Sequence, residues 1–152
     1  MQSDVDRTTQ SRQREQAAGW LLCYWRTKPA QSFDAHMRAE IRDWVGGLSS
    51  IDPQWRAAIA GDAAAAVAIA LEIRPVTQVC LAVDITMTIL LARAFDNAAA
   101  ALVLCDALRR IPLARSVRTT LLTSWMVFHS KLALRSTPWR RAHLFDQGRG
   151  TR

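Results

Sequence analysis

Apolar residues recur at helical spacing along most of this chain, and the first such pattern lies near its start. It consists of four residues at positions i, i+3, i+4 and i+7, which are Ala17, Trp20, Leu21 and Tyr24. This spacing predicts a first helix from about Ser11 to Thr27 with these side chains on its buried face. Pro29 is expected to end the helix, because proline has no amide hydrogen and its ring clashes with the preceding turn.

The second predicted helix begins after Ser32. Its apolar stripe is Met37, Ile41, Trp44 and Val45. Two consecutive glycines, Gly46 and Gly47, follow this stripe. Because glycine adopts the left-handed conformation at little cost, we expect the helix to leave through a left-handed residue at this pair.

Capping signals mark the next two helices. Asp52 precedes Pro53, and an aspartate before a proline predicts a capped helix that starts at the proline. Gly61 is expected to close this short third helix, and Asp62 is expected to cap a fourth.

A long apolar helix is predicted from about Thr77 to Ala94, and it is expected to be the central, buried one. One face is assigned Val76, Val79, Cys80, Val83, Met87, Leu90, Leu91 and Ala94, and another is assigned Leu81, Ile85 and Ile89. Asp84 lies within this helix, so its carboxylate needs an arginine, a hydroxyl or a backbone partner. A perturbed acid at a functional site is the other interpretation of Asp84.

The last predicted helix runs from about Ala114 to Leu134 and packs Val117, Leu121, Trp125, Phe128 and Leu132 against the core. No β-branched run shows strict alternation flanked by hairpin turns, so no sheet is expected. The sequence therefore predicts an all-α, compact bundle of about seven helices, built partly from stacked helical hairpins. Residues 1–10 are expected to be a flexible N-terminus, 11–135 a single helical domain and 136–152 a basic C-terminal tail.

Two segments of the chain look alike. Gly61 to Pro75 and Phe95 to Pro112 each contain a capping Asp or Asn, an alanine run, an Ala-Leu pair and a final proline, and each precedes a longer apolar helix. This pattern indicates a duplicated helical hairpin, although alanine-rich helices also look alike through composition alone. Phe95 to Pro112 resembles the second helix of a tetratricopeptide-type repeat at five positions: Ala100, Leu104, Ala107, Leu108 and Pro112. The resemblance implies a helical-hairpin scaffold.

Charge is distributed unevenly. The last 46 residues, from Ala107 on, hold ten of the 20 Lys and Arg and one acid, Asp146, which makes them +9, while the preceding 106 residues are −2. Clustered cations of this kind indicate a polyanionic partner. A solvated surface with a cationic tail kept for solubility, or cations that complement a helix dipole, would need no partner.

The candidate nucleic-acid-binding residues come from this segment. They are Arg109, Arg110, Arg115, Arg118, Lys131, Arg135, Trp139, Arg140 and Arg141. Trp139 lies beside arginines in a stretch without apolar periodicity, where an aromatic ring and guanidinium groups can stack on bases while the charges bind phosphates. Trp139 docking back on the core is the alternative.

Catalysis and metal binding find no support in the sequence. His36, His129, His143 and the three cysteines do not have the spacing of zinc ligands, and no glycine-rich phosphate loop or nucleophile elbow occurs. Asp34 and His36 are interpreted as capping and surface residues at a helix start. Cys23 and Cys105 are interpreted as core residues. We therefore expect neither a cofactor nor an enzyme.

The function predicted from these observations is a non-catalytic helical binding or assembly subunit, within a larger complex, that contacts a nucleic-acid phosphate backbone in a sequence-tolerant way. A protein–protein adaptor whose basic end meets an acidic protein is the alternative. No membrane span is expected, and three widely spaced cysteines, an odd number, indicate a reducing cytoplasm. A peripheral membrane protein would need a free amphipathic helix, whereas the last helix is expected to use its apolar face on the core.

Overall fold

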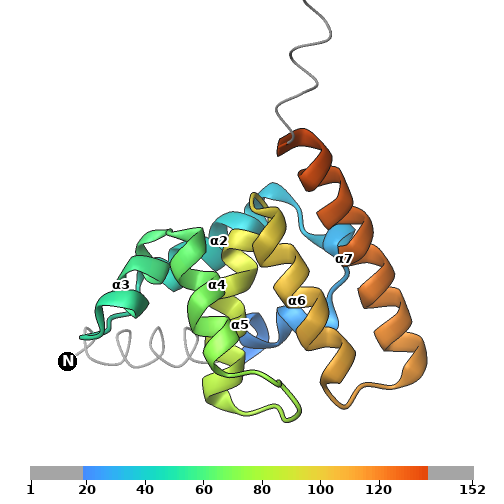
Figure 1. The fold of residues 1–152 in the computed structure, drawn as a ribbon, viewed down its shortest axis with the longest axis horizontal. Coiled ribbons are helices and arrows are strands. Elements are labelled where there is room, and N and C mark those ends of the chain that lie inside the picture. The colour runs from blue at the N-terminus through green and yellow to red at the C-terminus, as the bar shows by residue number, and fades with distance from the viewer. Residues whose placement is uncertain (1–18, 137–152) are drawn as a thin grey trace, which may run out of the picture.

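The computed structural model describes residues 19–136 of the chain, and these residues form an all-α bundle (Figure 1). Helix 19–27 comes first, followed by the short 3-10 turn η1 (Ala30–Ser32). The remaining helices are α2 (Ala35–Gly46), α3 (Pro53–Ala60), α4 (Ala63–Glu72), α5 (Leu81–Ala94), α6 (Ala98–Arg110) and α7 (Arg115–Ser136). No strand occurs within 19–136. The predicted all-α class and the predicted number of helices are therefore confirmed.

Three parts of the sequence-based interpretation fall on residues 1–18 and 137–152 and so lie outside the described residues. They are the flexible N-terminus, the beginning of the first helix and the basic tail with Trp139, Arg140 and Arg141.

The helix starts are built as the capping residues predict. Asp52 Oδ1 accepts hydrogen bonds from the amides of Gln54 and Trp55 at 2.8 and 3.0 Å, and Pro53 occupies the first turn of α3. Asp62 caps α4 in the same way. Aspartate side chains fit these places because the first amides of a helix have no partner within it.

Glycine ends only one of the two helices for which we expected it. Gly61 has a φ of +115°, and a Cβ there would lie 3.0 Å from Nη1 of Arg93, so both conformation and space require glycine. The prediction that α2 ends through a left-handed residue at Gly46-Gly47 is wrong. Gly47 has a φ of −82°, and its amide still donates to carbonyls of the last turn of α2.

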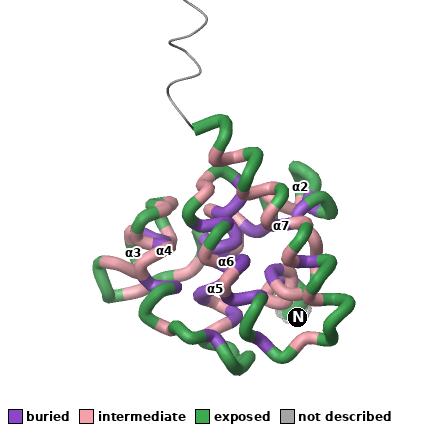
Figure 2. The backbone as a smooth tube through the Cα atoms, turned by 45° about the vertical axis from the view of Figure 1, so that its right-hand side comes forward, coloured by how far each residue is buried: buried purple, intermediate pink, exposed green. Residues whose placement is uncertain are grey.

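Helix α5 is covered on nearly all sides. Every residue from Thr86 to Ala92 is buried, as are Ala94 and Phe95, and Figure 2 shows the buried residues concentrated on α5 and α6. Helices α2, α4 and α6 all pack against α5, and α7 packs against α6 and η1. Helices α4 with α5 and α6 with α7 form the two predicted hairpins, and α4 also contacts α6, so the hairpins stack.

The predicted start of the central helix is wrong by about one turn. Val79 and Cys80 are exposed and precede α5, and Leu81 at its first position is 65% exposed. Val76 is buried, but it lies in the loop before the helix. Because α5 begins at Leu81, Asp84 lies in its first turn, where the unpaired amides favour a carboxylate.

The assignments of buried faces also need two corrections. Trp20 is 75% exposed, and the side chains that helix 19–27 buries are Leu21 and Trp25. Val117 is 43% exposed, because α7 enters the core only from Leu121 onward. There Trp125 joins an aromatic cluster, with its ring centroid 6.0 Å from that of Phe33 and 5.8 Å from that of Phe95.

Truncation of Met87 to alanine should reduce the free energy of unfolding by about 2–5 kcal/mol, the range for a large side chain removed from a core. Met87 is 1% exposed at the middle of α5. Leu81→Ala is the matched control, because Leu81 lies on the same helix in contact with solvent, and a change below about 0.5 kcal/mol is expected there. Urea titration measures both, and equal effects would contradict the buried position of α5.

The thiols of Cys105 and Cys80 should differ in reactivity toward an alkylating reagent. Burial raises the pKa of the Cys105 thiol to about 11, although the charge of Arg109 acts in the opposite direction. Cys80, by contrast, is exposed. Alkylation of the native protein at pH 8, read by mass spectrometry of peptides, should therefore label Cys80 and spare Cys105 until the protein is unfolded.

Candidate nucleic-acid interface

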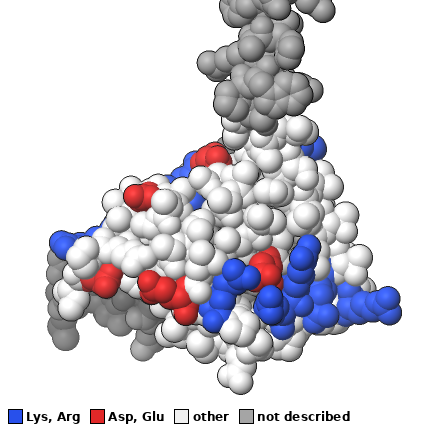
Figure 3. All heavy atoms as spheres, viewed as in Figure 1, with Lys and Arg blue, Asp and Glu red and all other residues white. Residues whose placement is uncertain are grey.

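Basic side chains gather where α6 ends and α7 begins, at the lower right of Figure 3. Arg109 and Arg110 form the last turn of α6, and Arg115 and Arg118 lie in the first turn of α7. Arg74, from the loop between α4 and α5, reaches the same place through an ion pair with Asp106 of α6. We call these five arginines the basic corner.

The turn between the two helices fixes the relative position of these arginines. Ile111 is fully buried and ends α6, and Pro112 follows it. Nη2 of Arg118 donates to the carbonyl oxygens of Ile111 and Leu113 at 3.0 and 3.2 Å, which ties α7 back to the turn. Arg118 therefore holds the corner together, and part of its hydrogen-bonding capacity is used within the protein.

One carboxylate lies within the basic corner. Asp106 Oδ2 is 2.7 Å from Nη2 of Arg74 and 3.4 Å from Nε of Arg110. The uneven charge of the sequence begins one residue later, at Ala107, so the sequence-based segment left this acid out. Arg109 and Arg115 are both exposed, and no ion pair is seen for either within residues 19–136.

The other predicted site residues of α7 lie far from the corner. Lys131 and Arg135 are exposed near the C-terminal end of α7. Sixteen residues separate Lys131 from Arg115, which is about 24 Å along a helix axis. The structure thus brings Arg109, Arg110, Arg115 and Arg118 together and separates them from Lys131 and Arg135.

A groove runs along α7 toward Lys131. It has a volume of about 560 Å³ and lies between α7 and η1, with Arg38 and Lys131 as its two cations and threonine side chains of α7 along it. Arg38 is held in place because its Nε donates to the carbonyl of Phe33 and its guanidinium stacks 4.9 Å from the Phe95 ring centroid. No acidic residue lines the groove.

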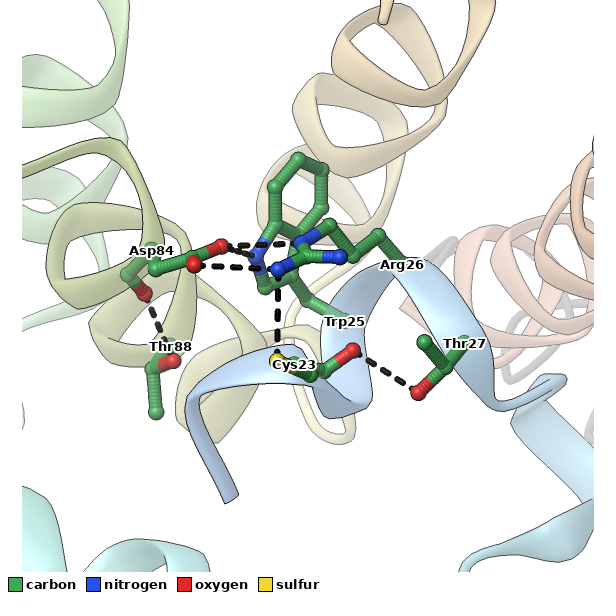
Figure 4. Close-up of polar contacts among 6 residues, drawn as sticks. All are labelled: Cys23, Trp25, Arg26, Thr27, Asp84 and Thr88. Atoms are coloured by element: carbon green, nitrogen blue, oxygen red, sulfur yellow. Dashed lines mark hydrogen bonds and ion pairs between the residues drawn. The ribbon is translucent and has the colours of Figure 1, made fainter. Parts of the chain in front are cut away.

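Asp84 is the second candidate, and it is fully engaged within the protein (Figure 4). Its Oδ1 accepts from Nε1 of Trp25 at 2.8 Å and from Nε of Arg26 at 3.1 Å, while Oδ2 accepts from Nη2 of Arg26 at 3.2 Å. The hydrogen bonds to Asp84 raise the pKa of the Arg26 guanidinium above its ordinary value. This three-residue cluster, which we call the Asp84 latch, attaches helix 19–27 to the start of α5.

The remaining polar residues singled out from the sequence have structural partners. Asp34 caps α2 through the Met37 amide, as expected. His129 Nδ1 lies 2.8 Å from the carbonyl oxygen of Ala98. Cys105 is buried as predicted, whereas Cys23 is only half-buried and its Sγ accepts from Arg26. No group of three or more potential metal ligands occurs in the described part of the chain, and no helix there is long and apolar enough to cross a bilayer.

Loss of the Asp84 carboxylate should cost about 1.5–3 kcal/mol of stability, the range for hydrogen bonds to a charged partner. Asp84→Ala leaves the buried Trp25 N–H without an acceptor, so the loss falls on the folded state. Asp43→Ala, which changes an exposed aspartate of α2, is the control. A double-mutant cycle of Asp84→Ala with Arg26→Met should give a coupling above about 0.5 kcal/mol. Additive effects would show that the Asp84 latch does not stabilise the fold.

A search for similar proteins gives no clue to the role of these sites. Comparison of the chain with protein-family models, with curated proteins and with solved structures finds no match.

Proposed function

We propose that this chain is a non-catalytic helical subunit that contacts the phosphate backbone of a nucleic acid through the basic corner. The observation that carries the proposal is the corner itself, where five arginines of α6, α7 and the α4–α5 loop gather and Asp106 pairs with two of them, Arg74 and Arg110. Guanidinium groups bind phosphate oxygens with charge-assisted hydrogen bonds. Such contacts position a nucleic acid and are insensitive to its sequence.

The charge of α7 supports the same interpretation. Its 22 residues include Arg115, Arg118, Lys131 and Arg135 and no acid. Cations lie at both ends of the helix, and no acidic residue lines the groove beside it, so no carboxylate there repels a polyanion. The tail residues Trp139, Arg140 and Arg141 extend this charge in sequence beyond α7.

The setting we propose is a larger complex in the cytoplasm. All three cysteines are free, which suits a reducing compartment. The corner arginines lie at one end of α7, and Lys131 and Arg135 lie near the other, so we propose that the chain supplies one part of a longer nucleic-acid path.

An adaptor that binds proteins is the second candidate. The α7 groove supports it, because Val127 is 50% exposed on this helix and lines the groove together with Phe128. An apolar strip beside cations fits a helix of an acidic protein. The resemblance of Phe95 to Pro112 to a tetratricopeptide-type helix belongs to this proposal as well. A partner that stays bound after nuclease treatment and at high salt would favour the adaptor over the nucleic-acid subunit.

Neutralising the two exposed, unpaired arginines of the corner tests the nucleic-acid proposal. Arg109→Gln with Arg115→Gln should weaken binding to a labelled oligonucleotide, measured by fluorescence anisotropy from about 50 to 200 mM salt. Each lost phosphate contact should lower the log–log salt slope by roughly 0.9 on duplex DNA or 0.7 on a single strand. Arg118 is left intact, because its hydrogen bonds hold the turn.

The opposite change should strengthen binding. Asp106→Asn removes the one carboxylate of the corner, and Glu40→Gln on α2 makes the same change in net charge away from it. We expect tighter binding only for Asp106→Asn. An unchanged salt slope in the arginine variant, or the same gain from both acid variants, would contradict the corner as the binding surface.

A further inference from the structure

A second group of arginines surrounds an open cleft at the other side of the molecule. The cleft has a volume of about 560 Å³, and its walls include Arg42 of α2, Arg56 of α3 and Arg93 of α5. Ser49 and Ser50, in the loop between α2 and α3, complete its polar lining. Helix α3 lies opposite α7 in Figure 1, so this cleft is separate from the basic corner. Its volume is within the range of small-ligand sites.

The cleft has an excess of positive charge. No acidic residue lines it. The carboxylate that approaches it is Asp96, whose Oδ2 is 2.5 Å from Nη2 of Arg42, but the Asp96 side chain is 73% exposed. Arg56 makes no ion pair that is seen within residues 19–136. One exposed carboxylate thus accompanies three cations, and it pairs with Arg42.

The guanidinium of Arg93 is partly buried and incompletely hydrogen-bonded. Its Nη1 donates to the carbonyl oxygen of Gly61 over a long 3.4 Å, and its Nε is buried with no hydrogen-bond partner. Burial lowers the pKa of the Arg93 guanidinium, the charge of Arg42 lowers it further, and Asp96 opposes both. A partly buried cation beside two others is costly unless an anion compensates it.

We propose that this cleft binds a phosphate group. One guanidinium can satisfy both oxygens of a carboxylate, whereas arginines on three helices and two serine hydroxyls present donors from several directions, which suits a tetrahedral oxyanion. The phosphate belongs either to a small phosphorylated molecule or to a nucleic-acid backbone. The inference rests on the cleft alone and is independent of the basic corner.

Titration with inorganic pyrophosphate in a calorimeter tests the site directly. Arg42→Gln with Arg56→Gln should raise the Kd at least tenfold, because both side chains are donors in the cleft wall. Arg109→Gln with Arg115→Gln carries the same change in net charge but removes donors from the basic corner alone, so it should raise the Kd by less than the cleft variant does. Arg93 is not substituted in either variant, because its side chain packs closely against Gly61.

A second measurement distinguishes a loss of pyrophosphate binding from a loss of folding. Pyrophosphate should raise the Tm of the unchanged protein, because a ligand that binds only the folded state stabilises it. The single change Arg56→Glu should abolish that rise while preserving the helical circular dichroism spectrum. No pyrophosphate binding by the unchanged protein, or equal loss in both double variants, would overturn the proposal.

The source of the phosphate follows from a parallel titration with a labelled single-stranded oligonucleotide. If the cleft variant weakens pyrophosphate and oligonucleotide binding alike, the phosphate belongs to a nucleic-acid backbone. If it weakens pyrophosphate alone, the ligand is a small phosphorylated molecule. Failure of the basic corner would appear separately, as an oligonucleotide affinity that does not respond to Arg109→Gln with Arg115→Gln.

Discussion

The burial of α5 is the constraint on which the other elements depend. A helix that is apolar on nearly every side is stable in water only when other helices cover it, and here α2, α4 and α6 do so. Helix α6 in turn provides the surface on which α7 packs. The position of the basic corner follows from this packing. Four of its five arginines lie at the turn between α6, which packs on α5, and α7, which packs on α6.

The two ends of α5 carry opposite charges, and these charges differ in how fully other groups of the protein compensate them. Asp84 in the first turn receives three hydrogen bonds from Trp25 and Arg26, so its charge is compensated inside the protein. Arg93 in the last turn has only a long hydrogen bond to a carbonyl and a buried Nε without a partner. Both charges suit the helix dipole, which explains why each is tolerated at its own end. Only Arg93 lies beside a cleft with further cations.

The helices were predictable because their signals are local. A capping aspartate, a proline in the first turn and a glycine with positive φ act within a few residues, and at Asp52, Pro53 and Gly61 the structure follows them. Burial depends on partners far along the chain. Trp20 and Trp25 are both apolar residues of helix 19–27, but only Trp25 can reach Asp84, 59 residues later, and Trp20 stays exposed. Periodicity alone does not distinguish them.

The candidate sites also differ in how far local sequence signals reveal them. Four of the five corner arginines are close in sequence, so a count of charges finds them, whereas Arg74 joins them through an ion pair with Asp106, 32 residues further along the chain. Arg42, Arg56 and Arg93 lie among acids in the part of the chain whose net charge is −2, and no charge count reveals them. Their signal is spatial: α2, α3 and α5 bring three guanidinium groups to one cleft, while Asp96, which pairs with Arg42, stays largely in solvent. A segment with a small net charge can therefore contain a local excess of cations, which its net charge does not reveal.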